Sequence, residues 1–224
     1  MEHCMNKSNR AYVLARSFMP EEYIIPTFFA IILAIVGAIG YGSYSWYVSS
    51  REAHAHRLLT AGLQEFEQAL TQDNNQTWQS VSETFAEGYK RAGSSNIAPL
   101  FLAFESEALL RQGKTDEARE RMHMVMKQLS QKSPFYYVYA IKSAMFDIDA
   151  EDATIKEQGI KQLTALAQNM KNPQRDYALY QLGFHYYMNE QVDKAKEYFT
   201  RLVREFATTS PWAHQAQMLL VSAE

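Results

Sequence analysis

The sequence predicts an all-α protein in which a single N-terminal transmembrane helix is followed by an α-solenoid of antiparallel helix pairs. Three observations lead to this fold class. Residues 23–50 contain no charged side chain. After Arg51, apolar residues recur at three- and four-residue spacing, which is the period of an amphipathic helix. No stretch of the sequence shows the strict alternation of apolar and polar residues that indicates a strand.

The composition fits one membrane segment and one globular domain. The 224 residues are 47% hydrophobic and 21% charged, and the 22 basic and 25 acidic residues give a net charge of −3. This balance, without an arginine-rich block, gives no reason to expect nucleic acid as a partner. Cys4 is the only cysteine, so the chain cannot form an internal disulfide bond.

The charge-free stretch divides the chain into a short cytoplasmic tail at 1–22, a transmembrane helix at 23–48 and a helical domain at 49–224. As a helix, the segment from Ile24 to Val48 would span about 37 Å, which is enough to cross a hydrocarbon core of about 30 Å. Aromatic residues gather at its far end, as in an interfacial belt, namely Tyr41, Tyr44, Trp46 and Tyr47.

A cleaved signal peptide is the competing interpretation of this stretch. Ala53-His54-Ala55 mimics a small-residue cleavage site. However, the apolar run is long, and the charged pair Arg51 and Glu52 separates it from that site. We therefore favour an uncleaved anchor.

Basic residues on the two sides of the anchor indicate its orientation. Lys7, Arg10 and Arg16 precede the helix, whereas Arg51 and Arg57 follow it. Because lysine and arginine accumulate on the cytoplasmic side, we expect the tail inside and the large domain outside. The sequence thus predicts a single-pass protein of the cell inner membrane with a periplasmic or otherwise extracytoplasmic C-terminal domain.

Small residues repeat every four positions within the anchor, at Ala30, Ala34, Ala38 and Gly42. Such a stripe allows two helix backbones to approach closely in a membrane. We expect it to pack against a membrane helix of a partner or of a second copy. The alternative is that alanine and glycine are simply frequent in membrane helices.

The domain after the anchor is helical almost throughout. Its first hairpin covers 51–91, with Leu59, Leu63, Phe66 and Leu70 on one helical face. Short polar or glycine-containing breakers separate the segments that follow. The predicted helices after the first are 77–91, 96–112, 115–131, 134–146, 156–170, 175–189, 192–206 and 211–222, the last as a terminal cap.

One hairpin carries a motif that resembles the tetratricopeptide repeat. Its members are Leu179, Leu182, Gly183, Tyr186, Ala195 and Phe199. Gly183 and Ala195 are small, so the two helices can approach closely where they cross. A weaker copy consists of Leu102, Ser106, Leu109, Ala118 and Met122, and there Glu105 replaces an apolar residue of the motif.

A second stripe on the same helix consists of Tyr177, Tyr180, Phe184 and Tyr187. In tetratricopeptide arrays this face of the first helix lines the concave groove where partners bind, and the resemblance implies the same here. Tyrosine suits such a groove because it offers a large apolar area and a hydroxyl that tolerates water. The alternative is that the stripe packs against the preceding hairpin. A mixed outcome would bury Phe184 and leave Tyr177, Tyr180 and Tyr187 partly exposed.

Taken whole, the layout resembles the YfgM-like family of ancillary subunits of the Sec translocon. The resemblance implies a membrane-anchored scaffold that assists envelope protein secretion or folding. Its implied partners are a translocon-like membrane complex, a periplasmic chaperone and envelope clients. An assembly factor for another envelope complex is the alternative within the scaffold class.

No catalytic motif stands out, so a small helical hydrolase is the weaker hypothesis and we expect no enzyme, cofactor or metal. His54 and His56 lie two apart, which suits solvated residues better than metal ligands. Met122 and Met126 beside His123 are predicted to fill the core. Carboxylate pairs are predicted to lie on solvated faces and in a polar loop, namely Glu65 and Glu67, Glu83 and Glu87, and Asp147 with Asp149 and Glu151.

Overall fold

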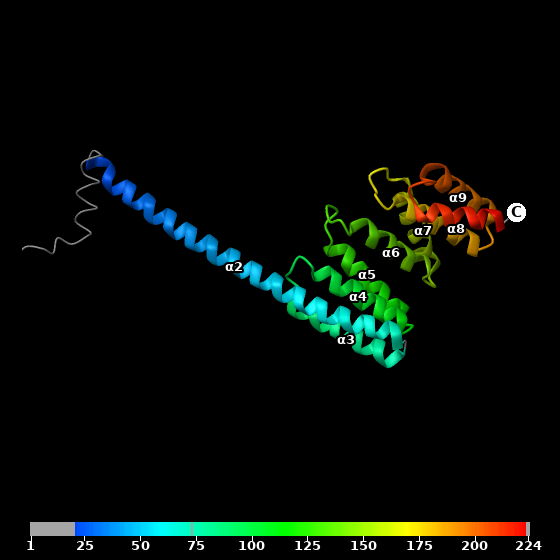
Figure 1. Cartoon of the computed structure of the whole chain (residues 1–224), viewed down its shortest axis with the longest axis horizontal. Coiled ribbons are helices and arrows are strands. Elements are labelled where there is room, and N and C mark those ends of the chain that lie inside the picture. Colours follow the sequence, from blue (N-terminus) through cyan, green and yellow to red (C-terminus); the bar gives the residue numbers. More distant parts are fainter. Residues whose placement is uncertain (1–20, 73, 223–224) are drawn as a thin grey trace, which may run out of the picture. The chain divides into compact units, whose positions relative to one another are not determined.

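The structure is a computed structural model that describes residues 21–72 and 74–222, apart from the side chains of 21–32 and 222. In this part of the chain it contains helices and no strand (Figure 1). The helices are α2 (Glu21–Gln72), α3 (Asn75–Ala92), α4 (Ala98–Arg111), α5 (Thr115–Gln128), α6 (Tyr136–Ile148), α7 (Ala153–Gln168), α8 (Arg175–Met188), α9 (Val192–Phe206) and α10 (Pro211–Ser222).

The chain divides into two compact units, Met1–Ala53 and His54–Glu224. Helix α2 contributes to both, whereas the sequence predicts a membrane helix that ends at Val48 and a separate first helix of the array. No glycine or proline lies between Val48 and Gln72 except Gly62, so nothing in the sequence forces the helix to end at the predicted boundary.

In the part of the chain whose side chains are described, no helix is long and apolar enough to cross a membrane. The expected cytoplasmic tail lies almost wholly outside the described residues, and so do the side chains of the first third of the expected anchor. The anchor at 23–48 therefore stays a prediction.

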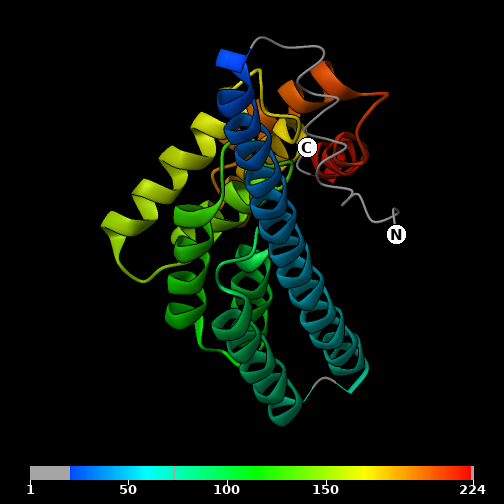
Figure 2. The same ribbon diagram turned by 90° about the vertical axis from the view of Figure 1, so that its left-hand side faces the viewer.

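The second unit is a stack of antiparallel helix pairs in chain order. Helix α3 pairs with the end of α2, α4 with α5, α6 with α7 and α8 with α9, while α10 packs on α9 and α8. Figures 1 and 2 show these pairs following one another through the unit. Each pair shares a core with the next, since α4 and α6 each contribute side chains to two clusters. The all-helical array is confirmed.

The connections between helices are short, and side chains cap the beginnings of α3 and α7. The side chain of Asn74 accepts a hydrogen bond from the backbone N–H of Thr77, and Asp152 caps α7. Because of the second cap, α7 begins at Ala153. The long polar connection predicted between α6 and α7 is therefore only the four residues from Asp149 to Asp152.

Three pairs of helices approach at a glycine that faces a phenylalanine ring. A Cβ atom placed on Gly183 of α8 would lie 2.5 Å from two carbons of Phe199 on α9. The same arrangement brings Gly62 against Phe85 and Gly88 against Phe101. In each case the ring occupies the volume that a larger side chain would fill. The close approach predicted at Gly183 is confirmed.

The weaker motif copy in α4 and α5 also forms a packed pair. Ser106 donates a hydrogen bond of 2.7 Å from its hydroxyl to the carbonyl of Ala118. Glu105, the residue that departs from the motif, is buried and accepts a hydrogen bond of 2.7 Å from Nε of Arg121. This bond raises the pKa of Arg121 above its ordinary value. An ion pair between the two helices thus stands where the motif has an apolar contact.

We predict that Gly183→Ala destabilises the array. The added methyl group would overlap the Phe199 ring, which is 1% exposed and cannot move aside without repacking. Overpacking of this kind typically costs about 1–3 kcal/mol, which exceeds the helix-propensity gain of alanine over glycine. Urea unfolding followed by circular dichroism measures the change.

The matched control is Gly40→Ala, because no atom lies within 4 Å of the Cβ position at this helical glycine. We expect this variant to unfold at the same or a slightly higher urea concentration than the wild type, because alanine favours the helix and meets no neighbouring atom there. Equal stability of Gly183→Ala and the wild type would contradict the close-packing interpretation.

Candidate functional site

The aromatic stripe predicted on α8 lies partly under α10. The ring of Tyr177 lies 4.7 Å from that of Trp212, and the ring of Tyr180 lies 5.2 Å from it, between centroids. Tyr180 also contacts Phe199, and burial raises the pKa of its hydroxyl. The contact with α10 was not predicted from the sequence. One interpretation placed the stripe in a groove, and the other placed it against the preceding hairpin.

The other two members of the stripe differ in exposure. Tyr187 is half-buried and packs on the core of α6 to α10. Phe184 is 36% exposed, and its ring stacks on Tyr180 with centroids 6.0 Å apart. Phe184 is therefore the stripe residue with the most surface left for a partner.

Phe184 borders a pocket of about 340 Å³ between α6, α7 and α8, which we name the α6–α8 pocket. Apolar side chains from three helices form most of it, and Met188 on its rim is 64% exposed. Methionine is flexible and polarisable, so such a pocket can adapt to side chains of different shape. Its lining consists of Met145, Ile148, Asp149, Leu163, Gln181, Phe184, His185, Met188 and Asn189.

Charged and titratable groups at this pocket are few. Asp149 lines it, and its carboxylate is exposed and forms no ion pair with the described residues. Burial lowers the pKa of His185 below its ordinary value of 6.5, so His185 is largely neutral at pH 7.

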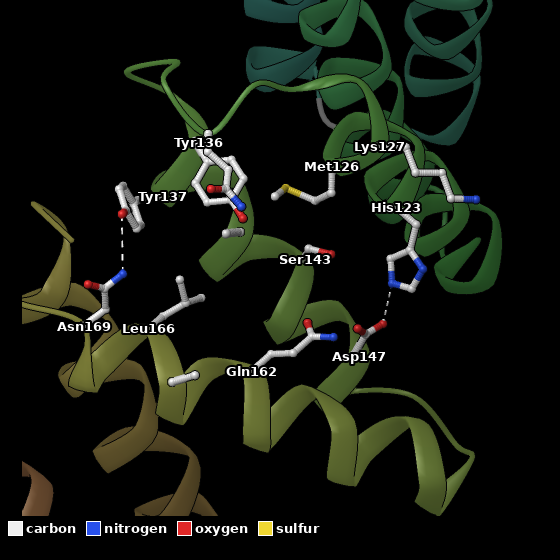
Figure 3. Close-up of a pocket in the computed structure, with 13 residues that line it drawn as sticks. His123, Met126, Lys127, Tyr136, Tyr137, Ser143, Asp147, Gln162, Leu166 and Asn169 are labelled. Atoms are coloured by element: carbon white, nitrogen blue, oxygen red, sulfur yellow. Dashed lines mark hydrogen bonds and ion pairs between the residues drawn. The ribbon is translucent and has the colours of Figure 1, made fainter. Parts of the chain in front are cut away.

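A larger groove of about 500 Å³ lies between α5, α6 and α7, and we name it the α5–α7 groove (Figure 3). His123 on α5 faces Asp147 on α6, and His123 Nε2 lies 2.7 Å from Asp147 Oδ1. At the other end, the amide of Asn169 on α7 donates a weak hydrogen bond of 3.4 Å to the hydroxyl of Tyr137.

Asp147 corrects a prediction from the sequence. The prediction placed it in a polar loop, but it lies within α6 and is 3% exposed. Its position three residues after the buried Ala144 puts it on the inner face of the helix, and this spacing was the available signal. A buried carboxylate needs a partner, and His123 supplies it.

The histidines and methionines considered as metal ligands do not gather at one site. In the described part of the chain, no group of three or more His, Cys, Asp or Glu side chains is placed to hold a metal ion. Met122 is fully buried, as predicted, and Met126 is half-buried in the α5–α7 groove. The exposed His54 and His56 lie on α2.

The stripe of small residues predicted in the membrane helix has four members, and the structure describes the surroundings of three of them. Ala34, Ala38 and Gly42 are exposed on α2, and no atom approaches the Cβ position of Gly42 within 4 Å. The side chain of Ala30 lies outside the described residues. The packing role of this stripe stays a prediction.

Comparison with known proteins agrees with the helix-pair architecture. Residues 177–209, which cover α8 and α9, match the model of the tetratricopeptide repeat family. No protein of curated function matches the sequence.

Two crystal structures are similar in fold, both of nearly identical TPR-like repeats attributed to a kinesin light chain of Podosopora anserina. The first is 19% identical with a TM-score of 0.56, and the alignment covers 76% of this chain and 86% of that chain. The second is 19% identical with a TM-score of 0.53 and covers 71% and 83%. At this identity the likeness shows the fold alone, which is a tetratricopeptide-like solenoid.

Proposed function

We propose that this protein is a scaffold that binds partner proteins through its helical array and is held at a membrane by residues 23–48. The observation that carries the binding function is the α6–α8 pocket. Phe184 and Met188 expose apolar surface beside it, and exposed apolar patches next to a concavity mark interaction sites. Tetratricopeptide-like arrays present such surfaces on rigid stacked helices.

The membrane anchor is supported by the surface of α2 in the first unit. Large apolar side chains are exposed along it and no charged residue interrupts them, so another apolar phase or protein is needed to cover them. These side chains are Leu33, Ile35, Val36, Ile39, Tyr41, Tyr44, Trp46 and Tyr47.

The finer function rests on the resemblance to the YfgM-like family. We infer an extracytoplasmic domain that works beside a Sec translocon-like complex and a periplasmic chaperone during envelope protein secretion or folding. An assembly factor for another envelope complex would use the same anchor and the same array, and the identity of the purified partner decides between them.

The proposed topology predicts that protease added to spheroplasts removes the domain after Ser50 and leaves an anchored N-terminal fragment. The protected fragment is detected with an antibody against a tag on the tail. Protection of the domain until detergent is added would show the opposite orientation. A mature N-terminus near His56 would show that the anchor is cleaved.

The tyrosine stripe predicts separate effects on stability and binding. Tyr180→Ala removes ring contacts with Trp212 and Phe199, so we expect the free energy of unfolding to fall by about 2 kcal/mol. Tyr187→Ala should cost less, because Tyr187 is half-buried and its ring pairs with no other aromatic ring among the described residues. If both variants lose stability and partner capture falls only in proportion to the unfolded fraction, the stripe has no binding function of its own.

The scaffold function predicts that Phe184→Ala combined with Met188→Ala reduces partner capture while most of the protein stays folded. Met188 is 64% exposed, so its truncation leaves little cavity, whereas Phe184 is 36% exposed and stacks on Tyr180, so a melting curve must show that most of the variant is folded at the temperature of the assay. The full chain is purified in mild detergent, and co-purified proteins are quantified by mass spectrometry.

The control for this experiment is Met170→Ala, because Met170 is 79% exposed and lies outside the α6–α8 pocket. It should capture partners at the wild-type level. Equal capture by the double variant and the wild type would remove the α6–α8 pocket from the proposed function.

A further inference from the structure

We propose that the α5–α7 groove binds a proline-rich segment of a partner protein in the extended polyproline II conformation. This groove is separate from the α6–α8 pocket, so the inference goes beyond the proposed function and adds a second site with its own class of partner. Three properties of the groove carry it, namely its length, its tyrosine rings and its free hydrogen-bond donors.

The groove is long enough for a short extended segment. Helix α6 contributes lining residues at intervals of four, three and four positions, which places them along one face of the helix. They are Tyr136, Ala140, Ser143 and Asp147. This face is about 16 Å long at 1.5 Å per residue. Side chains of α5 and α7 line the groove on either side of α6 (Figure 3). A polyproline II segment of about five residues has the same length at 3.1 Å per residue.

One end of the groove offers aromatic surface. Tyr136 and Tyr137 both line it, and their rings lie 5.3 Å apart between centroids at an angle of 86°. Met126 from α5 and Leu166 from α7 add apolar side chains to the lining. Proline-rich segments dock in aromatic-lined grooves of this kind. Because polyproline II is already extended before binding, such a segment loses little conformational entropy.

The middle of the groove holds a buried hydroxyl that lacks a partner. Ser143 is 5% exposed and lines the groove, and its side chain forms no hydrogen bond with the described residues. Figure 3 shows it on α6, between the ends of the groove at Tyr136 and Asp147. Since a buried hydroxyl is costly until it is bonded, Ser143 marks a point where an occupant gains by supplying an acceptor.

The other free polar groups of the lining also donate hydrogen bonds. Lys127 on α5 and the amide of Gln162 on α7 are exposed and form no hydrogen bond among the described residues. Lysine only donates, and a side-chain amide has two donor hydrogens. Asp147 supplies the carboxylate of the lining, but it is 3% exposed and already pairs with His123 at 2.7 Å.

This balance favours a proline-rich segment over an ordinary extended one. Proline keeps its backbone carbonyl but has no N–H group. A proline-rich segment can therefore accept hydrogen bonds from Ser143, Gln162 and Lys127 without burying donors of its own. An ordinary segment would bring N–H groups to a groove whose carboxylate is already paired.

Synthetic peptides test the inference on the full chain in mild detergent. Three fluorescein-labelled peptides of equal length are compared by fluorescence anisotropy: one of proline, one of alternating alanine and serine, and one of alternating alanine and glutamate. We expect the proline peptide to bind about ten-fold more tightly than the alanine-serine peptide. Its Kd should change little between low and high salt, because the recognition does not depend on charge. Failure of the proline peptide to bind, equal binding of the first two peptides, or tightest binding of the glutamate peptide would overturn the proposal.

Ser143→Ala tests the buried hydroxyl. It should weaken binding of the proline peptide about five-fold, the contribution of one hydrogen bond, while the melting temperature stays at or slightly above the wild-type value because the fold loses no bond. Gln162→Ala should also weaken binding. The matched control is Gln168→Ala, an exposed residue of α7 outside the groove, which should leave Kd unchanged. A lower melting temperature of Ser143→Ala with an unchanged Kd would show that the hydroxyl serves the fold and would overturn its role in binding.

The two sites are separated with the variant of the α6–α8 pocket. Met145 and Ile148 line that pocket from α6, whereas Ala140 and Ser143 line the α5–α7 groove, so α6 turns different faces to the two sites. Phe184→Ala with Met188→Ala should therefore leave Kd for the proline peptide unchanged, and a large loss of binding would show that the site is wrongly placed. If the proline peptide fails to bind while partner capture still depends on Phe184 and Met188, the scaffold function stands and the second site does not.

Discussion

The contact between a glycine on one helix and a phenylalanine ring on the next is the constraint on which the array depends. At Gly62, Gly88 and Gly183 the ring occupies the space of a side chain, so the distance between paired helices is set by the ring itself. Each pair then packs on the next through a shared core.

Helix α10 divides the exposed face of α8 into a structural part and a free part. Trp212 covers Tyr177 and Tyr180 near the beginning of α8, so these rings contribute to holding the last helix. Phe184 and Met188 lie one and two turns later, where they remain accessible. A single aromatic stripe in the sequence therefore serves two purposes, and the position of Trp212 determines the boundary between them.

Helical periodicity predicted the array well because each amphipathic helix buries one face. Helices α9 and α10 begin and end at the predicted residues, and Gly183 faces Phe199 as the motif requires. The burial of Asp147 was missed because it depends on His123, which lies 24 positions earlier on another helix. The pocket was missed for the same reason, since its lining comes from three helices and local patterns do not report which helices meet.

Three aspartates near the junction of α6 and α7 show how position sets the function of identical side chains. Asp147, within α6, points inward and pairs with His123, whereas Asp149 is exposed at the α6–α8 pocket. Asp152 accepts hydrogen bonds from the backbone N–H groups of Ile155 and Thr154, which hold its pKa below the ordinary value. It is therefore ionised at the N-terminus of α7, where the helix dipole favours negative charge. The cap fixes the end of the short connection, and with it the place of Asp149 at the α6–α8 pocket.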